Sequence, residues 1–278
     1  MEYDHADIFP NIEAIQTQFH HLVRTVPANG LIVANGTDTH LETAIKRGCW
    51  TAIERFGPGH VWDFKRGADR QEGQFDVLYQ AYLPNEEMAQ KNFGTIDWNL
   101  TGTHNTMNAL AAIAAARHAG VPAKVAVDAL NNFQGVARRM QVRGVVRGVT
   151  VYDDFAHHPT AIATTLNGLR RKIADAGRIY AVLEPRSNTM KQGVLSALLP
   201  DSLRDANTVF VYANNLGWDV AAAMQPIGTK TGIFVDLDAM VAAIAEMSQP
   251  NDHIVVMSNG GFGGVHEKLL AKLASLEV

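Results

Sequence analysis

The sequence predicts an α/β protein of two domains, the second of them a complete doubly wound, Rossmann-like domain with a mostly parallel sheet. Short apolar segments alternate with amphipathic helical segments over most of the chain, which is the pattern of strand–helix–strand units. The 278 residues are enough for about two domains of ordinary size. Hydrophobic residues make up 47% of the chain and charged residues 19%, as in a globular protein.

Composition disfavours three other classes of protein. No run approaches the ~18 consecutive apolar residues of a membrane span, and the acidic, polar start has no signal-peptide pattern. A single cysteine, Cys49, excludes an internal disulfide framework and agrees with a reducing compartment. The net charge is −4 and there is no basic tract for nucleic acid. We therefore expect a cytoplasmic protein.

The first half of the chain predicts a parallel sheet that continues into a hairpin. In order, the pattern predicts a helix over residues 12–26, a strand over 31–34, a helix over 37–46 and a strand over 51–55. Alternation over residues 62–83 then predicts an antiparallel hairpin with its turn at 71–73. A turn at Gly102 leads into an alanine-rich helix that ends at Gly120, and a second short helix covers 124–133.

The second half predicts a regular series of strands with helices between most of them. The strands are expected at residues 142–147, 150–153, 179–183, 208–212, 232–235 and 253–258. Amphipathic spacing over residues 161–173, after Pro159, predicts the helix that follows the second of these strands. In such domains ligands bind at the carboxyl ends of the strands.

Polar segments follow three of these predicted strands and should share one edge of the sheet. The first contains two carboxylates and two imidazoles, Asp153, Asp154, His157 and His158. The second includes Arg186, which suits a carboxylate, and the third is the glycine-rich stretch 259–264, which is weak evidence for a phosphate loop without its usual context. The simpler alternative is that the aspartates only cap a helix and that the histidines are surface residues.

The helix that starts after Gly102 is a second candidate site. Helix N-termini present free N–H groups and suit anions, and Asn105 and Asn108 lie in its first turns. On local chemistry alone these are more simply first-turn polar residues. Arg138 and Arg139 follow a glycine at an apparent domain junction, where they either bind phosphate in bidentate fashion or form a solvated pair.

Taken in order, four motifs resemble the consecutive motifs of the Mur ligases, the ATP-dependent peptide ligases of bacterial cell-wall synthesis. They are Asp4-His5-Ala6-Asp7, the stretch 102–109, the stretch 135–139 and the stretch 153–159. The resemblance implies that residues 1–136 are the latter part of the family's central ATP-binding domain and residues 137–278 its C-terminal peptide-substrate domain. The family's UDP-binding domain and P-loop have no counterpart in this sequence, so we expect a fragment that is inactive alone.

Within the family, residues 184–191, supported by residues 258–264, are similar to the branch that recycles cell-wall peptides. That branch joins UDP-N-acetylmuramate to the murein tripeptide L-alanyl-γ-D-glutamyl-meso-diaminopimelate. The alanine-adding branch has a Gln-Pro-His-Arg-type sequence where this chain has Glu184-Pro185-Arg186-Ser187. The resemblance favours a ligase of peptidoglycan recycling, a process tied to cell shape and division. The alternatives are the alanine-adding ligase and a non-catalytic peptide-binding module.

The resemblance also implies a reaction and a role for each candidate residue. ATP, with Mg²⁺, phosphorylates the muramoyl carboxylate, and the amine of the peptide attacks the acyl-phosphate. His5 would bind Mg²⁺, Asn105 and Asn108 would face the adenine, Arg138 or Arg139 would reach the phosphates, and Asp153 would accept from the ribose hydroxyls. The candidate catalytic residues are His157 and His158, where the C-terminal domain would close over the nucleotide. The expected peptide-binding set is Arg186, Ser187, Asn188 and Lys191.

Overall fold

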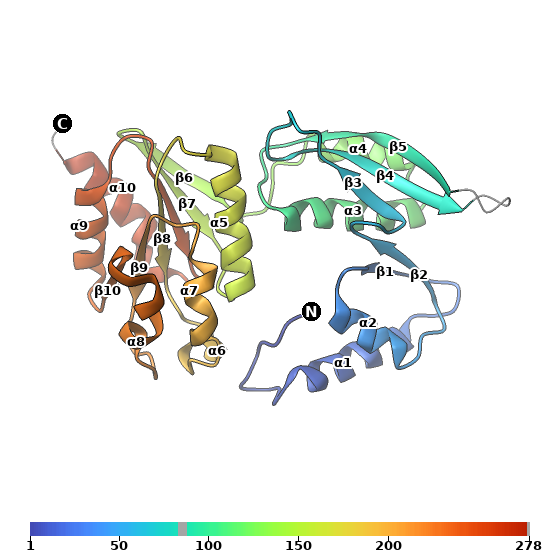
Figure 1. The fold of residues 1–278 in the computed structure, drawn as a ribbon, viewed down its shortest axis with the longest axis horizontal. Coiled ribbons are helices and arrows are strands. Elements are labelled where there is room, and N and C mark those ends of the chain that lie inside the picture. The colour runs from blue at the N-terminus through green and yellow to red at the C-terminus, as the bar shows by residue number, and fades with distance from the viewer. Residues whose placement is uncertain (83–87, 277–278) are drawn as a thin grey trace. The chain divides into compact units, whose positions relative to one another are not determined.

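The computed structural model describes residues 1–82 and 88–276. The chain divides into two compact units, residues 1–134 and 135–278, and each contains one sheet with helices (Figure 1). The predicted α/β fold class is confirmed. Of the helices in the described residues, none is long and apolar enough to cross a membrane.

The first unit contains a mixed sheet in the order β1-β2-β3-β4-β5. The strands are β1 (Leu31–Asn35), β2 (Ala52–Phe56), β3 (Trp62–Lys65), β4 (Gln74–Tyr82) and β5 (Met88–Asp97). The first three are parallel, and the last two continue the sheet in antiparallel fashion. The predicted hairpin is therefore present as β3 and β4. Strand β5 was not predicted, because its sequence is rich in polar residues and lacks apolar alternation.

The described helices of the first unit are α1 (Ile12–Thr25), α2 (Thr39–Lys46), α3 (Thr103–His118) and α4 (Ala123–Leu130). Two of these four, α1 and α2, begin at a residue whose side chain caps them. Asn11 Oδ1 accepts from the backbone of Ala14 at 2.9 Å, at the start of α1. Helix α4 ends earlier than predicted because Asn131 turns toward β5, where its side chain accepts from the N–H of Asp97 at 2.7 Å.

Helices α3 and α4 bury one large apolar cluster against this sheet. Its fully buried members include Trp62 and Phe75 from the strands, and Leu110 and Ile113 from α3. Helix α3 is therefore packed against the sheet along its length. Its N-cap is Gly102, at φ +89°, and no side chain of its own sequence caps its first N–H groups.

The second unit contains a sheet in the order β10-β9-β8-β11-β7-β6. The strands are β6 (Gln141–Val146), β7 (Val149–Asp154), β8 (Ile179–Leu183), β9 (Thr208–Tyr212), β10 (Thr231–Phe234) and β11 (His253–Met257). All neighbours are parallel except β6 and β7. The ends of all these strands lie within one residue of the predicted positions.

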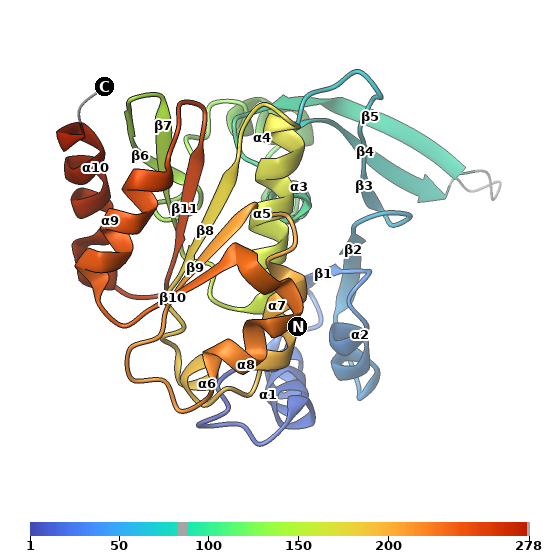
Figure 2. The ribbon, with the colours of Figure 1, turned by 60° about the vertical axis from the view of Figure 1, so that its left-hand side comes forward.

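Helices cover both faces of the second sheet (Figures 1 and 2). One face packs on α5 (Pro159–Ile173), α7 (Leu199–Ser202) and α8 (Val220–Met224), and the other on α9 (Leu237–Met247) and α10 (Val265–Ser275). The remaining turns are α6 (Asn188–Lys191) and the 3₁₀ segments Ser196–Leu198, Gln225–Lys230 and Phe262–Gly264. This is the doubly wound arrangement that the sequence predicts.

The chain reverses its direction across the sheet at β11. After β7 it moves outward through β8, β9 and β10, and it then returns to insert β11 between β8 and β7. The segments after β7 and β8 lead to helices of one face, whereas the segment after β11 leads to α10 on the other. In this fold class, ligands bind at the carboxyl ends of the strands next to such a reversal.

The central strand β8 should tolerate a core deletion poorly. The Leu183 side chain is fully buried in the cluster under α5. We expect Leu183→Ala to lower the free energy of unfolding of the second unit by about 2–5 kcal/mol. Leu198→Ala is the matched control, since that side chain is 54% exposed, and it should change stability by less than about 0.5 kcal/mol. Urea denaturation followed by circular dichroism measures both, and equal effects of the two variants would contradict this packing.

Candidate functional site

Three strands of the second unit end at the same level. Asp154 and Leu183 are both in register with Met257, and the ladder continues one residue further, because Ser258 N donates to Asp154 O and Glu184 N donates to Met257 O, each at 3.1 Å. The Ser258 hydroxyl then donates to the Glu184 carboxylate and accepts from Gly260 N at 2.9 Å. The three polar segments expected at one edge are therefore brought together there.

Asp154 is the buried anchor of this edge. Its Oδ2 accepts from Met140 N at 2.8 Å, and its Oδ1 accepts from Ala156 N at 2.8 Å and from the Thr165 hydroxyl at 3.4 Å. Burial raises the pKa of the Asp154 carboxyl, while the backbone hydrogen bonds oppose that shift. One carboxylate thereby joins the segment that enters β6 to the start of α5.

Asp153 lies in a different environment, although it is the next residue. Its carboxylate is 5% exposed and lies 3.4 Å from Arg138 Nε, 3.3 Å from Arg143 Nη1 and 3.5 Å from His266 Nε2. Burial lowers the pKa of the His266 imidazole, and the nearby Asp153 charge opposes this. Arg143 and His266 were not predicted, since an arginine in an edge strand and a lone histidine in a helix carry no signal in sequence.

The two adjacent arginines have different surroundings. Arg138 Nη2 donates to the carbonyls of Ser258 at 2.6 Å and Gly260 at 2.8 Å, in addition to the contact with Asp153. Its guanidinium stacks 5.0 Å from the Phe155 ring. Arg139 is exposed, with its guanidinium 5.7 Å from the same ring. The Arg138 guanidinium is therefore used in contacts within the second unit. The Arg139 guanidinium lies at the surface.

The two histidines are held locally at the start of α5. The His157 Nδ1 lies 3.0 Å from Phe155 O, and its ring packs edge-on against the Phe155 ring. His158 is the N-cap of α5, where its Nδ1 accepts from Thr160 N at 3.4 Å. Both imidazoles are half-buried. The helix-capping reading of this segment thus applies to His158 and not to the aspartates.

The segment after β8 carries the residues expected to bind the peptide. Arg186 is exposed and lies against Gly260, where an added Cβ would come within 2.5 Å of Arg186 Nη1. The Ser187 hydroxyl caps α6 by accepting from Met190 N at 3.3 Å, and the exposed residues Asn188 and Lys191 lie on that single turn. A further contact that the sequence did not predict fixes the turn, since the Trp218 indole N–H donates to Met190 O at 2.8 Å.

In the first unit, the candidate residues lie at the start of α3. Asn105 Nδ2 donates to Thr101 O at 2.7 Å, and Asn108 is exposed one turn further on. The Thr101 hydroxyl is buried, with no hydrogen-bond partner among the described residues. His5 is exposed at φ +54°. Over residues 1–82 and 88–276 no group of three His, Cys, Asp or Glu side chains is arranged to hold a metal ion.

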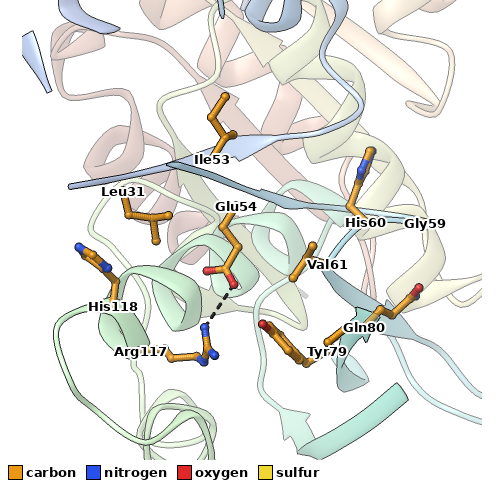
Figure 3. A pocket seen from close by; sticks show the side chains of 11 residues that line it. Leu31, Ile53, Glu54, Gly59, His60, Val61, Tyr79, Gln80, Arg117 and His118 are labelled. Carbon is orange, nitrogen blue, oxygen red and sulfur yellow. Dashed lines mark hydrogen bonds and ion pairs between the residues drawn. The ribbon is translucent and has the colours of Figure 1, made fainter. Parts of the chain in front are cut away.

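A cavity of about 500 Å³ lies elsewhere in the first unit (Figure 3). Its polar wall is the ion pair of Glu54 and Arg117, 3.3 Å apart, with the guanidinium 4.8 Å from the Tyr79 ring. Its size is that of a small-molecule site. Arg117 and His118 are at the C-terminal end of α3, roughly 18 Å along the helix from Asn105 at 1.5 Å per residue. No predicted site residue lines this cavity.

Removing the Asp154 carboxylate should destabilise the second unit. Asp154→Ala leaves the N–H groups of the half-buried Met140 and the buried Ala156 without their acceptor, and we expect a loss of about 1–3 kcal/mol in the free energy of unfolding. Asp175→Ala, which changes an exposed aspartate of the same unit, is the control. Thermal denaturation of the three proteins provides the comparison.

The same variant has a predicted pH dependence. Because the folded state raises the pKa of Asp154 above its ordinary value of 3.8, this shift stabilises the fold fully below pH 3.8, and that contribution is lost as the pH rises through the folded-state pKa. The stability difference between wild type and Asp154→Ala should therefore be larger in acid than at neutral pH. If this stability difference instead grows as the pH rises, the folded protein favours the ionised form of Asp154 over the protonated form.

Comparison with known proteins places the chain in a family. The model of the Mur ligase middle domain matches residues 1–116, and that of the Mur ligase glutamate ligase domain matches residues 138–260. The UDP-N-acetylmuramate–L-alanyl-γ-D-glutamyl-meso-2,6-diaminoheptandioate ligase of Escherichia coli K12 is 45% identical over 275 residues, which cover 99% of this chain and 58% of that protein. The ligase of the same name from Haemophilus influenzae is 42% identical, over 98% of this chain and 58% of its own length.

A solved structure agrees with these sequence relatives. The crystal structure of a murein peptide ligase from Psychrobacter arcticus has a TM-score of 0.69 and 37% sequence identity, over 97% of this chain and 56% of that one. The chain thus spans a little more than half the length of the relatives that it matches. Since the two domain models match most of both units, in the order of the four motifs, the chain belongs to the Mur ligase family and carries its middle and C-terminal domains.

Proposed function

We propose that this protein is an ATP-dependent C–N ligase of peptidoglycan recycling, which joins UDP-N-acetylmuramate to L-alanyl-γ-D-glutamyl-meso-diaminopimelate through an acyl-phosphate. The observation that carries the proposal is the 45% identity to the Escherichia coli ligase of that name over 99% of this chain. Residues 1–136 are the proposed latter part of the ATP-binding domain, and residues 137–278 the peptide-substrate domain. The reaction would take place in the cytoplasm, where one unpaired cysteine stays reduced.

The carboxyl edge of the second sheet is the proposed acceptor site. The acceptor peptide carries several carboxylates, and the segment after β8 presents Arg186, Asn188 and Lys191 at the surface. A planar guanidinium pairs with a carboxylate through two parallel hydrogen bonds. Ser187 would act by capping the turn that carries these side chains. Trp218 would hold the same turn from the loop after β9.

The proposed nucleotide contacts are assigned residue by residue. Asn105 and Asn108 are proposed to bind the adenine, because amide groups both donate and accept hydrogen bonds. We assign the phosphate contact to Arg139, since the donors of Arg138 are used by backbone carbonyls. Asp153 would accept from the ribose only by sharing its carboxylate with Arg138 and Arg143.

Two further roles complete the proposal. His157 and His158 are the proposed catalytic residues, because imidazole exchanges protons near neutral pH. Mg²⁺ would neutralise phosphate charge in this chemistry, with His5 among its ligands. The described residues of the chain do not form that metal site by themselves, so further ligands must come from ATP, water or other protein groups.

A titration of the 278-residue chain tests the acceptor. The ligand is the tripeptide L-alanyl-γ-D-glutamyl-meso-diaminopimelate, with free L-alanine as the comparison, and the readout is the heteronuclear NMR spectrum. We expect the tripeptide to shift resonances of residues 186–191 and 258–264 at concentrations where L-alanine has little effect. An equal response to both ligands would favour the alanine-adding ligase.

The neighbouring arginines provide a test of the nucleotide assignment. This chain can replace the aligned segment of the Escherichia coli relative, and ADP release by that chimera gives the ATP KM. Arg139→Ala should raise the KM for ATP about tenfold, as expected when a hydrogen bond to a charged phosphate is lost. The melting temperature of the 278-residue chain should stay near that of the wild type, because Arg139 is exposed.

Arg138→Ala is the matched variant, with the same charge removed one residue earlier. It loses the bonds to Ser258 O and Gly260 O and leaves Asp153 with fewer cations. It should therefore lower the melting temperature of the 278-residue chain. If Arg138→Ala raises the ATP KM at unchanged stability and Arg139→Ala does neither, the two assignments are reversed.

A further inference from the structure

The turn between β3 and β4 is locked against the segment that leads into α3. Gly73, at φ +95°, has no room for a side chain, because an added Cβ would lie 2.3 Å from Trp98 O. The neighbouring residue, Glu72, reaches across to the helix, where its Oε1 accepts from Gly102 N at 2.8 Å. Residues distant in sequence thus meet at the first turn of α3.

Glu72 replaces the cap that α3 does not have in its own sequence. Gly102 has no side chain to accept from the first N–H groups of the helix. The Glu72 side chain is 5% exposed, and a buried carboxylate at a helix N-terminus is stabilised by the free N–H groups and the helix dipole. A cap from a distant hairpin fixes the position of the helix start as well as satisfying its donors.

Arg66 makes a second link between the same turn and the same helix. Its Nη1 lies 3.6 Å from Glu72 Oε2, and its Nη2 donates to the hydroxyl of Thr106 at 2.8 Å. The guanidinium also lies 5.5 Å from the ring of Phe64 on β3. Thr106 itself is buried. Glu72 and Arg66 together hold the first turn of α3 at Gly102 and at Thr106.

Asn105 lies between these two fixed points. Its backbone N–H donates to Gly102 O at 3.0 Å, and its side-chain amide donates to Thr101 O at 2.7 Å. With one amide proton used in this way, the orientation of the Asn105 side chain is defined. A shift of Gly102 or Thr106 would change the direction in which that amide presents its remaining donor and acceptor.

We propose that Glu72 and Arg66 are positioning residues that set the orientation of the Asn105 amide and thereby the preference of this site for adenine over guanine. The inference rests on the proposed binding of adenine by Asn105. In this proposal Glu72 acts through Gly102 and Arg66 acts through Thr106. An amide held in one orientation matches the hydrogen-bonding edge of adenine, whereas a freely rotating amide can match either purine.

The first experiment uses the ligand-free chain and requires no assumption about its function. Nitrogen-15 spectra of the 278-residue protein report the side-chain NH₂ group of Asn105 and the backbone N–H of Gly102. We compare wild type, Glu72→Gln, Glu72→Ala and, as a control acid in the first turn of another helix, Glu13→Ala. Glutamine keeps an oxygen that can accept from Gly102 N, whereas alanine does not.

We expect the Asn105 side-chain signals to be dispersed in wild type, Glu72→Gln and Glu13→Ala. In Glu72→Ala they should move toward the values of a solvated amide, and the Gly102 N–H should exchange at least about tenfold faster, as when a charged hydrogen bond is lost. Unchanged Asn105 signals in a folded Glu72→Ala protein would overturn the positioning role. If Glu72→Ala fails to fold, Arg66→Lys provides the test, since it keeps the charge but loses the bidentate geometry.

The second experiment compares ATP and GTP, each with Mg²⁺, by titration of the same proteins. Wild type and Glu72→Gln should prefer ATP, and Glu72→Ala should lose most of that preference, while Glu13→Ala retains it. If wild type itself does not distinguish the two nucleotides, the proposed adenine site is wrong, and the proposal of a base preference falls with it. The spectra of the ligand-free chain then still decide whether Glu72 orients Asn105.

Discussion

A single buried carboxylate, that of Asp154, holds the carboxyl edge of the second sheet together. It accepts from the backbone just before β6 and from the backbone just after β7, and it contacts α5. Burial raises the pKa of this carboxyl, and the hydrogen bonds that it accepts oppose that shift. The arginine pair, the two histidines and the ends of β8 and β11 all take their positions relative to this point. The arrangement of polar groups at this edge thus depends on the buried carboxylate of Asp154.

Much of the fold could be predicted from sequence, because the apolar pattern of each strand agrees with its buried position in the sheet. Strands β8, β9 and β11 of the second sheet are nearly continuous apolar runs, as expected of parallel strands that are buried on both faces. Strand β5 could not be predicted, because it is polar and is defined by its pairing with β4. The end of α4 was placed too late for a similar reason, since it is set by the contacts of Asn131 with β5.

The sequence predicted which segments of the chain form the candidate site. It did not predict which side chains contact one another there. Sheet order brings Asp153, Glu184 and Ser258 to one edge, and the strand–helix rhythm was sufficient to expect that. Which groups satisfy each other depends on side-chain contacts between residues far apart in the chain, such as Arg143 and His266 with Asp153. The same holds for Glu72 and Gly102 in the first unit. Sequence motifs indicate which residue types are present. The side-chain contacts of the folded protein determine which of those residues remain accessible to a ligand.

The alternation of side chains along β7 has a consequence for how this edge can change during evolution. Neighbouring residues of a strand point to opposite faces, so Asp154 meets α5 while Asp153 meets α10. The sheet separates two acids that are adjacent in sequence into two sets of contacts with no shared partner among those described above. A substitution around α10 can therefore alter the surroundings of Asp153 without disturbing the anchor under α5. The two adjacent acids therefore belong to two separate parts of the structure, one packed with α5 and the other with α10.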